Sequence, residues 1–248
     1  MSIGDILDSL LTNGALSVPG MTFAVLVYEG RRTGWPAVAA PALCAAVGIL
    51  LVLFAEASGY GPAEVNRQLA GALELLPPLA SAVAATFAVL QDGGLELQLS
   101  LGRPYRLALL ARLLVALALT SVVAFCCATY LSLSGRLPGS GGLGAAQLVW
   151  LAPTLWMAAA GALVGVALRS PAASAGLLAI GWLLEEVKHD SFLETAGLRP
   201  LFLFATTFAP GAPFWGANRL ALLGSSVLLL AAWWLLLGRP ELLLQGES

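Results

Sequence analysis

Charged residues are scarce in this chain. Of its 248 residues, 59% are hydrophobic and only 10% are charged, whereas soluble domains carry about 25% charged residues. The single lysine, Lys188, does not lie in a GxxxxGK[ST] loop, which excludes a Walker A phosphate site. The single histidine, His189, excludes a two-histidine zinc helix. The three cysteines lie inside apolar runs without metal-ligand spacing, so we expect neither a metal site nor a disulfide framework.

Signals for nucleic acid, secretion and catalysis are also lacking. The net charge of −2 gives no sign of a nucleic-acid partner, and the first thirty residues contain no Lys or Arg, so no cleaved signal peptide is expected. The pair Glu185–Glu186 is similar to the glutamates of intramembrane CAAX-type proteases, but the histidines that those enzymes use are missing. Ser225 and Ser226 could suggest a serine nucleophile, whose only base would be His189. Helix packing explains these serines better.

Long apolar runs are abundant. A helix that crosses the roughly 30 Å of hydrocarbon needs about 20 apolar residues, and lipid offers no water to open backbone groups, so such runs form helices. We therefore expect an all-α polytopic membrane protein with one domain over residues 1–248. It would comprise an N-terminal segment at 1–34, a six-helix bundle at 35–237 and a cytosolic tail at 238–248. The expected transmembrane helices are 35–56, 66–91, 107–134, 146–168, 171–187 and 219–237.

The positions of Lys and Arg predict the orientation. With the N-terminus inside, seven of these residues fall on the cytosolic side and five outside, and three of the outer five lie in or beside one long loop, where charge has less weight. The tryptophans fall into two groups, one at each expected interface, as in an aromatic belt. We expect a multi-pass protein of the plasma or inner membrane with both termini cytosolic.

Residues 1–33 are too polar to span a membrane. Met21, Val25 and Tyr28 would share one face of a helix, which predicts a helix lying in the cytosolic interface before the first span. The expected interfacial residues are Tyr28, Glu29, Arg31 and Arg32. Residues 1–18 fit a floppy tail equally well.

Glu74 and the pair Pro77–Pro78 interrupt the second span. Two adjacent prolines remove two backbone donors, so a kink or break is expected there. Ionisable groups at membrane depth are costly and face the bundle interior or water. Glu74 therefore either reaches the outer interface or pairs with an arginine, or it contributes a polar element to a substrate path.

A long outer segment precedes the last span. It begins with the polar cluster EEVKHD, which is either a solvated loop cap or a charge-sensing gate, and continues into LFLFATTF. This apolar run is too short to cross, which favours a re-entrant or interfacial segment that helps close an external gate. The candidate path or gate residues are Glu74, Pro77, Pro78, Glu185, Glu186, Phe208 and Phe214. The GxxxG spacing of Gly161 and Gly165 predicts close helix packing within the chain.

The stretch GGLELQLSLGRPYRLALLAR, from Gly93 to Arg112, joins the second and third spans. Arginines at a helix centre would cost about 2.5–3.5 kcal/mol each on insertion scales, whereas at a cytosolic turn they cost little. The alternating leucines of this stretch are typical of a strand, but an isolated strand lacks a partner. We therefore expect a short surface helix in which Leu95 and Leu99 stack one turn apart.

This stretch resembles the hallmark of ABC-2 type transporter permeases, a Gly-(Thr/Ser)-Leu-Glu-Leu-Leu-Leu-Ser-x-Pro-x-x-Arg segment after the second span. Gln98 replaces an apolar residue of that pattern, Pro104 comes late, and the upstream acidic residue is Asp92. The layout also agrees: an interfacial helix, six spans and a long outer loop before the last. The matching residues are Gly94, Leu95, Glu96, Leu97, Leu99, Ser100 and Arg106.

The resemblance implies a permease subunit of an exporter, with no enzymatic activity or cofactor of its own. It would pair with a second permease subunit, as a homo- or heterodimer, and recruit two copies of a separate ABC ATPase subunit that bind ATP and Mg. The implied coupling segment comprises Asp92, Gly94, Leu95, Glu96, Leu97, Leu99, Ser100, Arg103 and Arg106. One alternative is the permease-like subunit of a haem-handling cytochrome c maturation complex. The alternative from another class is an intramembrane enzyme.

Overall fold

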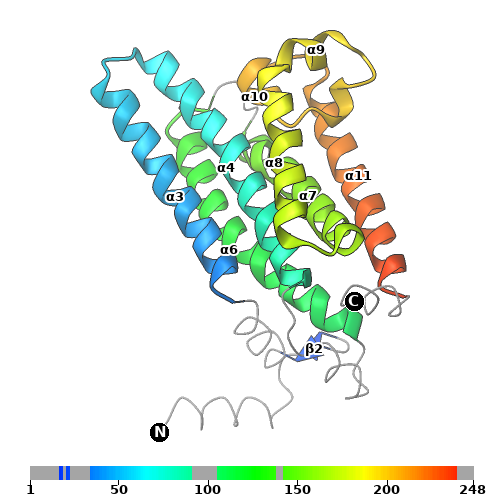
Figure 1. The fold of residues 1–248 in the computed structure, drawn as a ribbon. Helices are drawn as coiled ribbons and strands as arrows, with labels where there is room; N and C mark the ends of the chain where they lie inside the picture. The colour runs from blue at the N-terminus through cyan, green and yellow to red at the C-terminus, as the bar shows by residue number, and fades with distance from the viewer. Residues whose placement is uncertain (1–16, 19–20, 23–33, 91–104, 138–141, 239–248) are drawn as a thin grey trace, which may run out of the picture.

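Six long helices make up most of the part of the chain that the structure describes. The computed structural model describes residues 17–18, 21–22, 34–90, 105–137 and 142–238. Successive helices run in opposite directions (Figure 1). We call the end that holds Ser58 and Trp215 the upper end, and the end that holds Gly34 and Leu236 the lower end. The helices are α3 (Gly34–Ala57), α4 (Pro62–Leu90), α6 (Tyr105–Leu133), α7 (Leu143–Leu168), α8 (Pro171–Val187) and α11 (Trp215–Leu236).

These helices agree closely with the six apolar runs of the sequence. Among the described residues, α4, α6, α7 and α11 are long and apolar enough to cross a membrane. The prediction of a helical membrane protein is therefore confirmed at this level. The helix α8 has 17 residues, about 26 Å at 1.5 Å per residue, somewhat less than the hydrocarbon thickness.

The connection between α7 and α8 is made by Arg169 and Ser170 alone. Arg169 ends α7 with φ of 53°, in the left-handed region. The Ser170 hydroxyl then accepts a hydrogen bond from the Ala173 amide at 3.3 Å, and Pro171 opens α8. Because serine is a favoured N-cap and proline a favoured first helical residue, the sequence starts α8 here and returns it beside α7.

The centre of the bundle is the contact between α4 and α7. A Cβ on Gly161 would lie 2.6 Å from the Ala82 carbonyl oxygen, so only glycine permits this approach. The Ser81 hydroxyl lies 2.7 Å from the Pro78 carbonyl and 3.0 Å from that of Thr154, across the helix pair. Gly161 therefore serves intramolecular packing, as the GxxxG spacing predicts.

The structure corrects two sequence expectations about local conformation, namely a break at Pro77–Pro78 and a helix at Met21 and Thr22. The helix α4 continues through Pro77 and Pro78 without a break. Met21 and Thr22 form a two-residue strand (β2, Met21–Thr22) paired with β1 (Ser17–Val18), where an interfacial helix was expected. The sequence between the strands is Pro-Gly, a pair that favours a turn over a helix. The remainder of the expected interfacial helix, with Tyr28, Glu29, Arg31 and Arg32, lies outside the described residues, as does the tail from residue 239.

Short elements cover the upper end between α8 and α11 (Figure 1): α9 (His189–Glu194), η1 (Arg199–Leu201) and α10 (Ala205–Phe208). We call residues 202–208 the inserted segment. Its first four residues are buried and pack with side chains of α4, α7, α8 and α11. The run that is too short to cross therefore lies among the helices rather than over them.

Candidate functional site: a buried ion pair at the inserted segment

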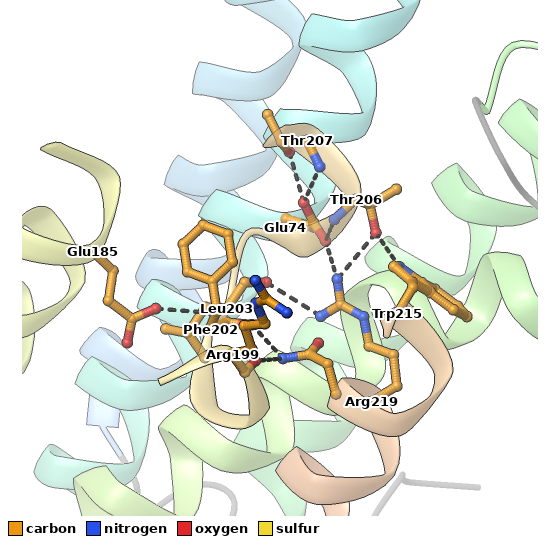
Figure 2. A network of polar contacts seen from close by, with 10 residues as sticks. Glu74, Glu185, Arg199, Phe202, Leu203, Thr206, Thr207, Trp215 and Arg219 are labelled. Carbon is orange, nitrogen blue, oxygen red and sulfur yellow. Dashed lines mark hydrogen bonds and ion pairs between the residues drawn. The ribbon is translucent and has the colours of Figure 1, made fainter. Parts of the chain in front are cut away.

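Glu74 of α4 lies about 18 Å from the upper end of its helix, at 1.5 Å per residue, and is fully buried. Its carboxylate accepts four hydrogen bonds (Figure 2). The Thr206 amide donates to Oε1 at 2.8 Å, and the Thr207 amide and hydroxyl donate to Oε2 at 2.7 and 2.6 Å. The fourth donor is Nη2 of Arg219. The Glu74 carboxylate therefore holds the inserted segment chiefly by the backbone amides of that segment.

Arg219 of α11 is the counter-charge of Glu74, and it too is fully buried. Its Nη1 donates to the Leu203 carbonyl at 3.2 Å, and its Nη2 to the Thr206 hydroxyl at 3.0 Å. The guanidinium carbon lies 5.4 Å from the centre of the Trp215 ring, a cation–π distance. Trp215 in turn donates its indole N–H to the Thr206 hydroxyl at 2.9 Å.

Two further side chains hold the beginning of the inserted segment. Glu185 of α8 accepts a hydrogen bond from the Leu203 amide at 2.9 Å (Figure 2). Asn218 of α11 donates to the carbonyls of Arg199 at 2.7 Å and of Phe202 at 2.9 Å. Non-helical backbone at membrane depth persists only where protein or water satisfies its polar groups. Side chains from α4, α8 and α11 meet that requirement here.

The charges at this site offset each other. Removing two ions from water is costly, and a buried pair is stable only when further hydrogen bonds satisfy both partners. Glu74 and Arg219 have such bonds. Arg67, the arginine nearest to Glu74 along the sequence of α4, instead pairs with Glu64 in an exposed contact. Of the alternatives for Glu74, the structure shows the pairing with an arginine.

The other candidate gate residues occupy different surroundings. Pro77 and Pro78 lie one turn below Glu74 in α4, and Phe208 stacks on the His189 ring at a centroid distance of 4.0 Å. Phe214 lies under the Arg199 guanidinium at 5.5 Å. The backbone carbonyl of Glu186 lies 2.9 Å from His189 Nδ1, within hydrogen-bond distance. Glu74 and Glu185 thus hold the inserted segment, while Pro77, Pro78, Glu186, Phe208 and Phe214 are not bonded to the ion pair in the described structure.

Most of the expected coupling segment lies outside the described residues, namely Asp92, Gly94, Leu95, Glu96, Leu97, Leu99, Ser100 and Arg103. Arg106 is described. It lies in the first turn of α6, and its guanidinium carbon is 5.7 Å from the centre of the Trp234 ring of α11. Arg112, further along α6, is buried. Both arginines are therefore helical, and the start of α6 lies beside the end of α11.

The two serines considered as candidate nucleophiles are bonded within their own helix. Ser225 and Ser226 donate their hydroxyls to carbonyls of their own helix, at 2.7 Å to Ala221 and 2.6 Å to Leu222. His189, their only candidate base, lies against Phe208 instead. Within the described ranges, no group of three or more His, Cys, Asp or Glu is arranged to hold a metal ion.

Sequence reasoning identified Glu74 and Glu185 but not their partners. The partners lie close to one another in the chain but more than 130 positions from Glu74. They are Thr206, Thr207, Trp215, Asn218 and Arg219. One signal was available: Glu74 is the one ionisable residue of α4 after Arg67, and Arg219, of opposite charge, is the one ionisable residue of α11. Comparisons with family models, curated proteins and solved structures gave no match to this chain.

Proposed function

We propose that this chain is the membrane-spanning permease subunit of an ABC-2 type exporter, with six transmembrane helices and both termini cytosolic. The observation that carries the proposal is the sequence motif from Gly93 to Arg112. It follows α4, which ends at Leu90, and continues into α6, which begins at Tyr105. Both ends lie at the lower end of the bundle, where α3 begins and α11 ends (Figure 1). In this proposal the coupling segment and both termini lie on the cytosolic side. The arrangement supports the proposal because all of them are attached to the lower end of the bundle.

Basic residues support the same orientation. Arg106 begins α6 and Arg169 ends α7, both at the lower end, and Arg31, Arg32, Arg103 and Arg239 belong to sequence attached there. Cytosolic connections carry an excess of Lys and Arg. The lower end is therefore the cytosolic end in this proposal, and the upper end, with α9 and α10, faces outward.

The partners in this proposal are two copies of a separate ABC ATPase, which bind ATP and Mg, and a second permease subunit. When the ATPases close on ATP, they push the segment around Glu96 and Arg103 and thereby displace the lower ends of α4 and α6. The helix α4 packs against α3, α6, α7, α8 and α10. A displacement of α4 would therefore change its contacts with these five helices.

The test begins with the partner. A tagged form of the chain, purified from native membranes, should retain an ATPase that carries a Walker A motif. In that complex Glu96→Ala and Arg103→Ala should abolish the stimulation of ATP hydrolysis by the permease, because the grip of the ATPase on the segment is lost. The readout is phosphate release with and without the permease.

Arg136→Ala is the matched control, because Arg136 is an exposed cation at the opposite end of α6. It should leave stimulation intact. Full stimulation in the Glu96→Ala and Arg103→Ala variants, or a native complex without any nucleotide-hydrolysing subunit, would contradict the proposed function.

A further inference from the structure

We propose that the inserted segment and α11 form a carboxylate receptor, that Glu74 is its built-in ligand, and that occupancy of this receptor keeps the inserted segment within the bundle. The receptor consists of the amides of Thr206 and Thr207, the Thr207 hydroxyl and the Arg219 guanidinium. Each of these groups donates to one carboxylate, and the carboxylate comes from a different helix.

The donor set has the chemistry of a carboxylate site. Both carboxylate oxygens accept two hydrogen bonds each, from donors on the inserted segment and on α11. Charge-assisted hydrogen bonds of this kind are roughly twice as strong as neutral ones. The indole N–H of Trp215 holds the Thr206 hydroxyl in place, and the Leu203 carbonyl holds the Arg219 guanidinium. All the hydrogen-bond donors of the receptor thus come from the inserted segment and α11, and α4 provides the carboxylate.

Occupancy controls the inserted segment because the donors are its own backbone. Without a carboxylate, the amides of Thr206 and Thr207 and the charge of Arg219 would lack their acceptor in a buried site. Buried donors without acceptors are costly, so water must enter or the segment must leave. Glu74 therefore acts as a latch between α4 and the inserted segment.

The size of the ligand allows a direct test. Glu74→Ala removes a CH₂–COO⁻ unit, which acetate matches in heavy atoms. In a cysteine-free background, a cysteine in place of the buried Ala205 reports exposure of the inserted segment, and a cysteine in place of the exposed Ala196 is the reference. The purified protein in lipid nanodiscs is labelled with a hydrophilic maleimide. Both faces are then accessible and no ATPase is present, so the result does not depend on the proposed export function.

In Glu74→Ala, the rate of labelling at position 205 should rise about tenfold or more. A tenfold rise corresponds to a loss of about 1.4 kcal/mol in the free energy that keeps the inserted segment within the bundle. Sodium acetate should reverse the rise and sodium chloride at equal concentration should not. Glu74→Gln should also raise labelling, because its amide cannot accept all four hydrogen bonds. Acetate should have no effect there, since the side chain still fills the receptor. Labelling at position 196 should be the same throughout.

Several outcomes would overturn the latch. These are unchanged labelling at position 205 in Glu74→Ala, equal effects of acetate and chloride, or an acetate effect in Glu74→Gln. If Glu74→Ala does not yield folded protein, Glu74→Gln carries the test, and parental labelling in that variant overturns the proposal. Glu194→Ala, an exposed acid of the same region, should behave as the parent, and a rise in labelling there would remove the specificity for Glu74.

Discussion

Single residues decide how polar backbone survives among apolar helices. The inserted segment has the composition of a core, and yet its amides and carbonyls require partners. Glu74, Glu185, Asn218 and Arg219 supply them. The apolar side chains of Phe202 and Phe204 meanwhile pack edge to face at 5.9 Å. Two kinds of interaction therefore hold the same residues: apolar burial for the side chains, and hydrogen bonds with polar and charged side chains for the backbone.

Truncation of Arg219 should be among the most damaging single changes. Arg219→Ala leaves Glu74 as a buried charge without its counter-ion, which typically costs about 3–5 kcal/mol. Arg67→Ala breaks an exposed pair with Glu64 and should cost less than about 1 kcal/mol. Reversible denaturation in detergent measures both. Equal loss of stability in the two variants would contradict the prediction that the buried pair of Arg219 contributes more to stability than the exposed pair of Arg67.

The sequence could identify Glu74 as an interior residue because a carboxylate inside a long apolar run has few alternatives. It could not identify Arg219, which stands in the first turns of its helix, where an arginine at the membrane surface is unremarkable. Only the fold brings that turn beside the middle of α4. The threonines carry even less signal, because they act mainly through backbone amides, which every residue but proline offers.

At the scale of elements, the contact between α4 and α7 depends on a close approach of their backbones. The two glycines of the GxxxG pair differ in their surroundings. A Cβ on Gly161 would collide with the Ala82 carbonyl, whereas a Cβ on Gly165 would lie 3.7 Å from the Thr86 Cα, an ordinary contact. The sequence pattern treats the two positions as equivalent, and the structure does not.

Alanine at the two positions should therefore have different effects. Gly161→Ala forces α4 and α7 apart and should destabilise the protein by about 1–3 kcal/mol, as overpacking does. Gly165→Ala should be neutral or stabilising by up to about 1 kcal/mol, because glycine is a poor helix former. The denaturation midpoint of each variant in detergent distinguishes them. Destabilisation by Gly165→Ala as large as by Gly161→Ala would contradict this account of the contact.

Helix positions were more predictable than backbone details. Hydrophobic length marks a helix because the period of burial does not matter when lipid or protein surrounds every face. The effect of Pro77–Pro78 could not be judged in that way, because packing on both sides can keep a proline-containing helix continuous. The Pro-Gly pair after Val18 carried the local signal for a turn, and the periodic apolar residues that follow it obscured that signal.

For the whole molecule, the arrangement in Figure 1 sorts the connections into two groups. The ends that flank residues 91–104 and the turn at Arg169 share the lower end. The connection that bears α9 and α10 belongs to the upper end. If the lower end is cytosolic, as proposed, a probe that reaches one group from a given side of the membrane cannot reach the other from that side.

Cysteine labelling tests this sidedness. In a cysteine-free background, Ser100→Cys should react with a membrane-impermeant maleimide only in inside-out vesicles. Ala196→Cys, in the upper connection, should react only in intact cells. The positions serve as controls for each other. Reaction of Ser100→Cys from outside would reverse the orientation and remove the basis for an ATPase at that segment.

The distance along the chain between Glu74 and Arg219, 145 residues, has a consequence for biosynthesis. The ribosome delivers α4 to the membrane long before the codons for α11 are translated, so the carboxylate must enter the translocon without its final counter-ion. Until α11 is synthesised, the Glu74 carboxylate depends on water or on other polar groups to satisfy its charge. The buried ion pair therefore forms only after α11 has entered the membrane beside α4.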